Sequence, residues 1–271
     1  MLDTTAFRVT GNDPPLVLAN HDPDSRAGFE GGKMEGKQAI HGLREELSAL
    51  QERLWAQSEQ ALLVILQAMD TGGKDGTIRH VFRGVNPQGV RVHGFGRPSP
   101  EELSHDYLWR IHRQAPEKGM ITIFNRSHYE DVLVVRVHDL VPEARWSRRY
   151  RHIRDFERML AEEGTRIVKV FLHISPDEQK ERLQSRLDEP AKRWKFSRAD
   201  LDERALWGEY QKAYQAAIAE TAADHAPWYV VPANRKWYRN LVVSSILIQT
   251  LEDMGPRFPE PEESLDDLVV T

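Results

Sequence analysis

Residues 61–76 read Ala-Leu-Leu-Val-Ile-Leu-Gln-Ala-Met-Asp-Thr-Gly-Gly-Lys-Asp-Gly, and this stretch decides the fold. The apolar run 61–66 predicts a buried strand, and the glycine-bearing turn that follows ends in Lys74 before a helical pattern begins. A strand, a glycine loop and a helix in this order cradle phosphate, because backbone N–H groups and a helix N-terminus point at the anion. Asp70 and Asp75 stand in the same turn, and carboxylates tolerate phosphate when a divalent metal lies between them.

Apolar runs alternate with helical patterns along most of the chain. The expected strands are Ala61–Gln67, Gly89–Phe95, Gly119–Phe124, Arg166–Ile174 and Trp228–Val231. The expected helices are 41–60, 76–84, 100–114, 129–137, 147–163, 176–187, 199–223 and 235–254. Such alternation predicts an α/β fold in three layers, with an about five-stranded parallel sheet that helices cover on both faces.

Composition limits the classes of protein to which this chain can belong. The 271 residues carry a formal net charge of −5 and no cysteine. The lack of cysteine excludes disulfides, thiolate catalysis and Cys-ligated metal sites, and the negative charge argues against a nucleic-acid-binding protein. No apolar run is long enough to span a bilayer, and no signal peptide is visible. We therefore expect a cytoplasmic protein with no membrane partner.

The glycine loop departs from the generic phosphate-loop pattern G-x-x-x-x-G-K-[ST] at two positions. Ala68 stands in place of the first glycine, and Asp75 stands in place of the metal-binding hydroxyl residue. One interpretation is a chance Gly-Gly-Lys turn after a core strand. The other is a phosphate loop in which Asp75 and Asp70 hold magnesium. In that case the loop residues that would contact substrate are Thr71, Gly72, Gly73, Gly76 and Thr77.

Polar residues gather directly after the strand 119–124. In open α/β sheets ligands bind outside the carboxyl ends of the strands, so Asn125, Arg126, Glu130 and Asp131 fall where a site should be. The two carboxylates could also serve only to cap the next helix. Capping explains Arg126 poorly, because the helix dipole disfavours a cation at a helix N-terminus.

A third segment, 182–196, carries five basic and two acidic residues between two helical patterns. Arg182 and Arg186 are spaced to share one helix face. We interpret the segment as a helical lid over the site, at about 182–200, that brings arginines to a transferring phosphoryl group. A solvated, salt-bridged hairpin is the alternative. Other basic residues that could contact a long anion are Arg79, Arg83, Arg97, Lys192 and Arg193.

Together these segments resemble the family-2 polyphosphate kinases. The segment 68–77, Ala-Met-Asp-Thr-Gly-Gly-Lys-Asp-Gly-Thr, resembles the Walker A variant of that family, and 124–131, Phe-Asn-Arg-Ser-His-Tyr-Glu-Asp, resembles its Walker B segment. The segment 188–196, Asp-Glu-Pro-Ala-Lys-Arg-Trp-Lys-Phe, resembles its lid signature. The similarity covers about 36–254. We expect an N-terminal arm at 1–34, a catalytic domain at 35–255 and an acidic tail at 256–271.

The resemblance implies a thymidylate-kinase-like P-loop fold and reversible phosphoryl transfer between inorganic polyphosphate and adenine or guanine nucleotides. It implies magnesium, which manganese could replace, and a homo-oligomer. Asp70 and Asp75 resemble the metal-managing carboxylates of the family, Lys74 its phosphate-binding lysine, and Arg126 and Arg186 its phosphate-clamping arginines.

Two positions distinguish this chain within the family pattern. Asn125 stands where many members have Asp, which leaves its direct metal role open, and Glu130 stands where other members carry Asn. An acidic residue there resembles the class that accepts both AMP and ADP. The alternatives are an ATP-dependent nucleotide or nucleoside kinase and a non-catalytic polyphosphate-binding protein.

Overall fold

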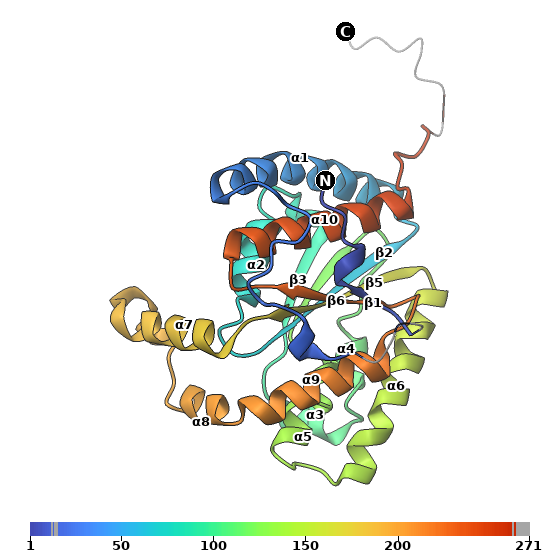
Figure 1. Cartoon of the computed structure of the whole chain (residues 1–271). Coiled ribbons are helices and arrows are strands. Elements are labelled where there is room, and N and C mark those ends of the chain that lie inside the picture. Colours follow the sequence, from blue (N-terminus) through green and yellow to red (C-terminus); the bar gives the residue numbers. More distant parts are fainter. Residues whose placement is uncertain (12, 14–15, 262, 264–271) are drawn as a thin grey trace.

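The computed structural model describes residues 1–11, 13, 16–261 and 263, and its centre is a six-stranded sheet (Figure 1). The strand order is β1-β6-β5-β2-β4-β3. The strands are β1 (Arg8–Val9), β2 (Ala61–Ala68), β3 (Val90–Gly94), β4 (Ile121–Asn125), β5 (Thr165–His173) and β6 (Trp228–Pro232). Neighbours among β2–β6 pair in parallel, whereas β1 pairs with β6 in antiparallel fashion.

Helices cover both faces of the sheet (Figure 1). On one face lie α1 (Lys33–Gln57), α2 (Lys74–Val81) and α10 (Lys236–Met254), and on the other lie α6 (Glu143–Glu162) and α9 (Trp207–Thr221). The shorter helices are α3 (Pro100–Ser104), α4 (Trp109–His112) and α5 (Val134–Val137). All eight residues of β2 are buried, because β4, β5 and both helical layers surround it. None of the helices in the described ranges is long and apolar enough to cross a membrane.

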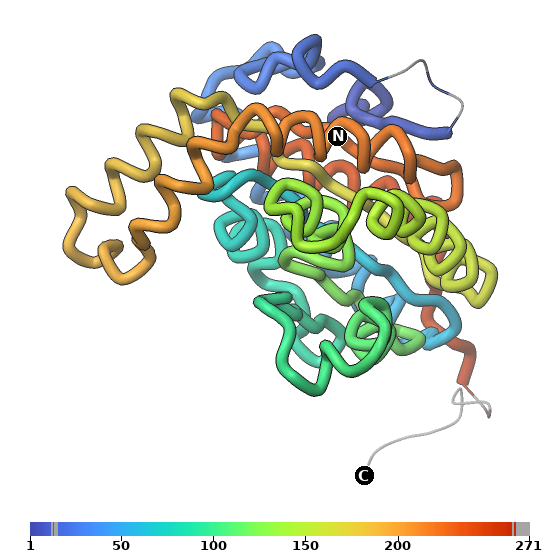
Figure 2. Tube along the Cα trace, turned by 90° about the horizontal axis from the view of Figure 1, so that it is seen from below, coloured from blue at the N-terminus to red at the C-terminus, as the bar shows by residue number. Residues whose placement is uncertain are grey.

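A helical hairpin projects from the body of the molecule in both views (Figures 1 and 2). It consists of α7 (Pro176–Asp188), a 3-10 turn (Pro190–Lys195) and α8 (Ala199–Ala205). Pro190 begins the turn directly after α7 ends, as expected for a residue that lacks an N–H and cannot continue a helix. The segment interpreted as a lid lies within this hairpin.

The predicted three-layer α/β architecture is confirmed, and its five parallel strands are found with small shifts at their ends. The strand β1 was not predicted, because its two residues, Arg8 and Val9, are too few to show a strand pattern. Three predicted helices are wrong as continuous elements. The predicted helix 100–114 divides into α3 and α4, because the Asp106 carboxylate accepts a hydrogen bond from the Leu108 N–H at 2.9 Å and forms a turn. The predicted helix 199–223 divides at Leu206.

The predicted helix 129–137 is a 3-10 turn, His128–Asp131, followed by α5. The Ser127 hydroxyl accepts a hydrogen bond from the Tyr129 N–H at 3.2 Å, and both side chains are fully buried. Burial of the Tyr129 ring therefore fixes the turn. The helical spacing of apolar residues in 129–137 does not predict this turn.

The N-terminal segment packs on the body, with Leu2, Phe7 and Leu18 buried in the main core. Its residues also hold the β6–α10 turn: the Asn234 N–H donates to Pro23 O at 3.1 Å, and the Arg235 guanidinium pairs with Asp24. This segment therefore fixes the start of α10. Most of the acidic tail predicted at 256–271 lies outside the described residues.

Candidate active site

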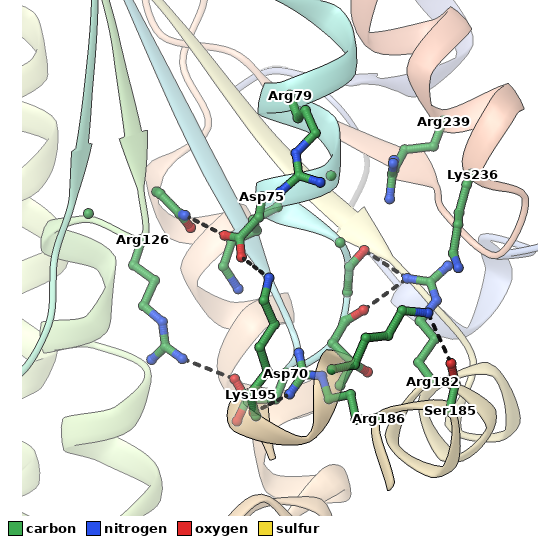
Figure 3. A pocket seen from close by; sticks show the side chains of 18 of the residues that line it. Asp70, Asp75, Arg79, Arg126, Arg182, Ser185, Arg186, Lys195, Lys236 and Arg239 are labelled. Carbon is green, nitrogen blue, oxygen red and sulfur yellow. Dashed lines mark hydrogen bonds and ion pairs between the residues drawn. The ribbon is translucent and has the colours of Figure 1, made fainter. Parts of the chain in front are cut away.

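A cavity of about 990 Å³ opens at the carboxyl ends of β2 and β4 (Figure 3). The register pairs Leu66 with Asn125, so the glycine loop after β2 and the polar segment after β4 leave the sheet side by side. The cavity brings together most of the predicted site residues: Asp70, Thr71, Gly72, Gly73, Lys74, Asp75, Gly76, Arg79, Asn125, Arg126, Arg182, Arg186 and Lys192. In the described part of the chain its walls carry nine basic and four acidic side chains, an excess of +5.

The glycine loop needs its two central glycines. Gly73 has φ of +102°, a conformation that side chains disfavour, and a Cβ there would overlap the Arg239 guanidinium. A Cβ on Gly72 would lie 2.5 Å from the Ala68 Cβ. The Thr77 hydroxyl donates to Gly73 O at 3.1 Å and is buried, so Thr77 closes the loop from behind rather than facing the cavity.

Lys74 opens α2 with its ammonium donating to Ala68 O at 3.2 Å. Burial is the main reason that its pKa lies below the usual value for lysine, and the nearby Arg126 charge lowers it further. The carboxylates of Asp70, Glu130 and Asp75 oppose this shift. The lysine thus lies half-buried at the cavity wall, among charges of both signs.

The two loop carboxylates have different partners. Asp70 accepts from the Arg126 guanidinium at 3.0 Å, and Asp75 accepts from the Asn125 amide at 2.8 Å and faces the Lys195 ammonium at 3.5 Å. Burial alone would raise the pKa of Asp75, but the Asn125 hydrogen bond and the Lys195 charge outweigh it and lower the pKa. No cluster of three or more Asp, Glu, His or Cys side chains suited to a metal occurs among the described residues.

Two carboxylates without a third protein ligand suit magnesium, which is usually held by one or two carboxylates together with water and substrate phosphates. Asp70 and Asp75 therefore fit this ion better than they would fit zinc or calcium, which take more ligands from the protein.

Arg126 stands opposite the loop in a left-handed conformation, with φ of +64°. For a residue with a side chain this conformation costs on the order of 1 kcal/mol, so the surrounding structure must impose it. The guanidinium bridges Asp70 and Glu130, the latter at 3.4 Å, and Glu130 is the main reason that the pKa of Arg126 is raised.

The hairpin contributes Arg186 and Lys192, whose partners lie within the hairpin. Arg186 donates to Lys195 O at 3.2 Å and approaches the Asp200 carboxylate at 3.4 Å, and Lys192 pairs with Glu189 at 2.5 Å. Both line the cavity from the hairpin side, and Figure 3 shows Arg186 there.

Arg182 is engaged by the protein itself. Its guanidinium donates to Thr71 O and Gly72 O at 3.0 Å, and to Ala233 O and Asn234 O beyond β6. It therefore ties the glycine loop to the β6–α10 turn. Its predicted contact with substrate stays a prediction.

Six predicted site residues do not line this cavity. Thr77 closes the loop from behind, and Glu130 pairs with Arg126, which does line the cavity. The Arg193 side chain donates to Leu187 O, Arg97 is exposed after β3, and Arg83 lines a second hollow of about 650 Å³ beside α1. Asp131 accepts from the Arg149 guanidinium at 2.9 Å and joins the segment after β4 to α6.

Two cavity residues that the sequence reading missed are Lys236 and Arg239, in the first turn of α10 (Figure 3). Arg239 is only 2% exposed, makes no ion pair with any carboxylate of the described chain, and bonds to Asn240 Oδ1 at 2.8 Å. Burial lowers its pKa to about 9, and the Arg182 charge adds to the effect. A buried guanidinium beside the glycine loop that forms no ion pair within the described ranges is placed to bind an anion.

The sequence matches the family model described as "Polyphosphate kinase 2" over residues 31–259. The chain belongs to the polyphosphate kinase 2 family. It is 59% identical over 258 residues to an AMP/ADP-polyphosphate phosphotransferase of Meiothermus ruber, covering 95% of this chain and 97% of the relative. It is 48% identical over 242 residues to an ADP-polyphosphate phosphotransferase of Rhodopseudomonas palustris, covering 83% and 84%.

The crystal structure of polyphosphate kinase 2 from Arthrobacter aurescens TC1 superposes with a TM-score of 0.93 at 46% identity, covering 96% of this chain and 93% of that one. The resemblance drawn from the three sequence segments is therefore confirmed at the level of the family and the fold.

One prediction for this polyphosphate kinase 2 chain concerns Asp131. Burial raises its pKa to about 6, although the Arg149 and Arg110 charges oppose the shift. A folded pKa above the unfolded value means that the group contributes stability below about pH 4 that is lost as pH rises through about 6. Relative to Asp131→Asn, the wild type should therefore lose about 1–3 kcal/mol of unfolding free energy over this window, measured by urea unfolding at pH 4 to 7. Asp155→Asn, at an exposed position of α6, is the control. A wild-type-minus-variant difference that stays constant with pH would contradict the raised pKa.

Proposed function

We propose that this protein transfers the terminal phosphoryl group of inorganic polyphosphate reversibly to AMP and to ADP, giving ADP and ATP. The activities by which its relatives from Meiothermus ruber and Rhodopseudomonas palustris are named support the substrate pair. The observation that carries the proposal in this chain is the cavity itself: a glycine loop faces an excess of cations, and one of them, Arg239, is buried and forms no ion pair with the residues that the structure describes. Guanine nucleotides as further substrates, a homo-oligomeric state and a cytoplasmic location belong to the same proposal.

The two sides of the cavity differ in a way that suggests which substrate each receives. The glycine loop and Lys74 are the elements that hold donor phosphates in P-loop enzymes, and Lys236 and Arg239 extend that cationic wall along α10. Arg126 and Asn125 stand on the β4 side. We place the polyphosphate chain against the loop and α10, and the acceptor nucleotide phosphate against Arg126.

The chemistry requires little proton transfer. A nucleotide phosphate has its second ionisation near pH ~6, so its terminal oxygen is already anionic at neutral pH. This agrees with a cavity whose charged side chains are mainly cations, nine against four carboxylates among the described residues. The obstacle is repulsion between two polyanions, about 4 kcal/mol for two unit charges 4 Å apart in a partly screened site. Lys74, Arg126 and Arg239 offset this repulsion and orient the phosphates.

In this proposal Asp70 and Asp75 hold magnesium, which manganese could replace, and the Asn125 amide orients the Asp75 carboxylate. The ion, when bound, neutralises charge on the donor phosphates. Lys195 approaches Asp75 from the hairpin, so closure of the hairpin and metal loading involve the same carboxylate.

Glu130 is the residue expected to set the balance between the two acceptors. It pairs with Arg126, and the Gln67 amide lies between it and Ser127, 3.1 Å from each in the orientation that satisfies both. Glu130→Asn removes a negative charge beside Arg126, and the site should then favour the more highly charged acceptor. We expect the ratio of kcat/KM for ADP to that for AMP to rise about tenfold, a change of about 1.4 kcal/mol. Steady-state assays with both acceptors measure it, and a ratio within twofold of the wild type would exclude this role.

A coupled assay separates the candidate functions. The purified protein is given polyphosphate, magnesium and either AMP or ADP, and formation of ADP and ATP is followed. In a parallel reaction ATP replaces polyphosphate as the donor to a nucleoside or nucleotide. Turnover with polyphosphate supports the proposal. Turnover only with ATP would instead identify an ordinary nucleotide or nucleoside kinase, and binding of polyphosphate without turnover would identify a binding protein.

A further inference from the structure

A buried ion pair joins α6 to β5 and is used by no step described above. Lys169, on β5, and Glu157, on α6, are 0% and 1% exposed, and their charged atoms are 2.6 Å apart. Replacing a buried ion pair by well-packed apolar residues is often neutral or stabilising, because desolvation of the two charges offsets their attraction. The pair is therefore poorly explained as a source of stability alone.

The other bonds of this pair lead to one segment. Glu157 Oε1 accepts from the Tyr129 hydroxyl at 2.8 Å and lies 3.2 Å from His128 Nε2. The Lys169 ammonium donates to the Tyr129 hydroxyl at 3.1 Å and to Thr221 O, on α9, at 2.8 Å. The pair thus joins β5, α6 and α9 to the turn His128–Asp131, which begins two residues after Arg126.

Arg126, which precedes that turn, has a backbone conformation that the surrounding structure must impose. Arg126 has φ of +64°, and its N–H donates to Leu66 O on β2. Ser127 is fully buried and bonds to the Tyr129 N–H and to the Gln67 amide. From His128 onward the segment is held by Glu157 and Lys169. These two charged residues therefore fix the backbone that follows Arg126.

We propose that Glu157 and Lys169 are positioning residues for phosphoryl transfer, which hold the His128–Tyr129 turn so that the Arg126 guanidinium faces the cavity. The inference rests on the proposed role of Arg126 in binding the acceptor phosphate. An ion pair provides directional contacts that an apolar pair of similar volume lacks. Its removal should therefore lower turnover more than it lowers stability.

The principal test compares two double variants. Glu157→Leu/Lys169→Met replaces the network with apolar side chains, whereas Glu157→Gln/Lys169→Met is also neutral but keeps an amide that can bond to Tyr129 and His128. We expect the first variant to keep its Tm within a few degrees and to lose at least tenfold in kcat, with KM for polyphosphate within twofold of the wild type. The second should recover most of the lost kcat.

Controls separate this inference from the proposed function. Thr122→Val alters another buried polar side chain of the sheet, whose hydroxyl has no partner among the described residues, and should leave kcat unchanged. Arg126→Ala reports on the proposed function itself: if it retains normal turnover, the role of Arg126 is wrong, whatever the double variants do. If Arg126→Ala is inactive while folded Glu157→Leu/Lys169→Met has wild-type kcat, the positioning role is wrong.

A milder variant covers the case in which the double variants do not fold. Tyr129→Phe removes only the hydroxyl that links the turn to the pair and leaves the Glu157–Lys169 contact in place. We expect its kcat to fall threefold to tenfold, with an unchanged KM for polyphosphate and a cooperative thermal transition. A folded Tyr129→Phe protein with the kcat of the wild type would overturn the inference.

Discussion

Arg126→Ala is expected to lower kcat by about 10³-fold or more while leaving the fold intact. The guanidinium is 41% exposed, so its loss removes little buried surface, and its partners Asp70 and Glu130 are partly exposed and can be hydrated. The large effect follows from the proposed role of the arginine, which is to offset charge on the reacting phosphates, where each lost interaction acts directly on the barrier.

The measurement is kcat with polyphosphate and each acceptor, beside the Tm of the variant. Arg158→Ala, at an exposed arginine of α6 that pairs only with Asp155 and Glu162 of the same helix among the described residues, controls for the loss of a charge and should keep both values. A folded Arg126→Ala protein that retains a tenth or more of the wild-type kcat would remove Arg126 from the mechanism.

Arg239→Met is expected to weaken polyphosphate binding and, at the same time, to raise the thermal stability of the unliganded protein. A folded pKa of about 9, below the usual 12.5, means that the charged side chain is destabilised on folding at every pH below 9. Methionine removes that cost, on the order of a few kcal/mol, and fills much of the same volume. We expect the KM for polyphosphate to rise about 100-fold, because the donor phosphate loses its buried counter-charge.

The thermal shift with ligand provides the sharper readout. Polyphosphate should raise the Tm of the wild type by several degrees and should have little effect on Arg239→Met, since stabilisation by a ligand follows its affinity. Arg166→Met, at an exposed position of β5, is the matched control and should respond like the wild type. A lower Tm for Arg239→Met without ligand, or an unchanged KM, would contradict the assignment of an unpaired buried cation at the donor site.

Much of the lining of the cavity could be predicted from the sequence, because it follows from local pattern and one topological rule. The loop with Lys74, Asp70 and Asp75 is continuous in the chain, and its strand–turn–helix context is readable. Arg126 and Asn125 lie after another strand, and the carboxyl ends of parallel strands meet at one edge of the sheet. That these segments would converge required no knowledge of side-chain packing.

Lys236 and Arg239 could not be found in this way, because they begin a helix whose remaining residues are almost all buried in the core. The periodicity of 235–254 is that of a structural helix, and nothing local connects it to the glycine loop. One signal was available: two cations in the first turn of a helix oppose its dipole, which is the reason that Arg126 stood out after β4.

The role of Arg182 was equally hidden. Its spacing from Arg186 predicts two arginines on one lid face, yet four backbone carbonyls from two distant turns converge on Arg182 alone. The main-chain oxygens of those two turns bind Arg182 and not Arg186 because the fold brings the turns next to Arg182. The spacing of residues in the sequence does not predict this.

The uneven distribution of charge has a consequence for the speed at which substrates arrive. The cavity walls carry an excess of +5, and since the whole chain carries −5, the remainder carries −10. A long polyanion is therefore repelled over most of the surface and steered to one mouth. Such steering acts over a Debye length of about 8 Å at physiological ionic strength and shortens as salt is added. Added salt should accordingly slow capture of the highly charged donor more than that of AMP, so the preference among substrates becomes a function of the ionic medium as well as of the pocket.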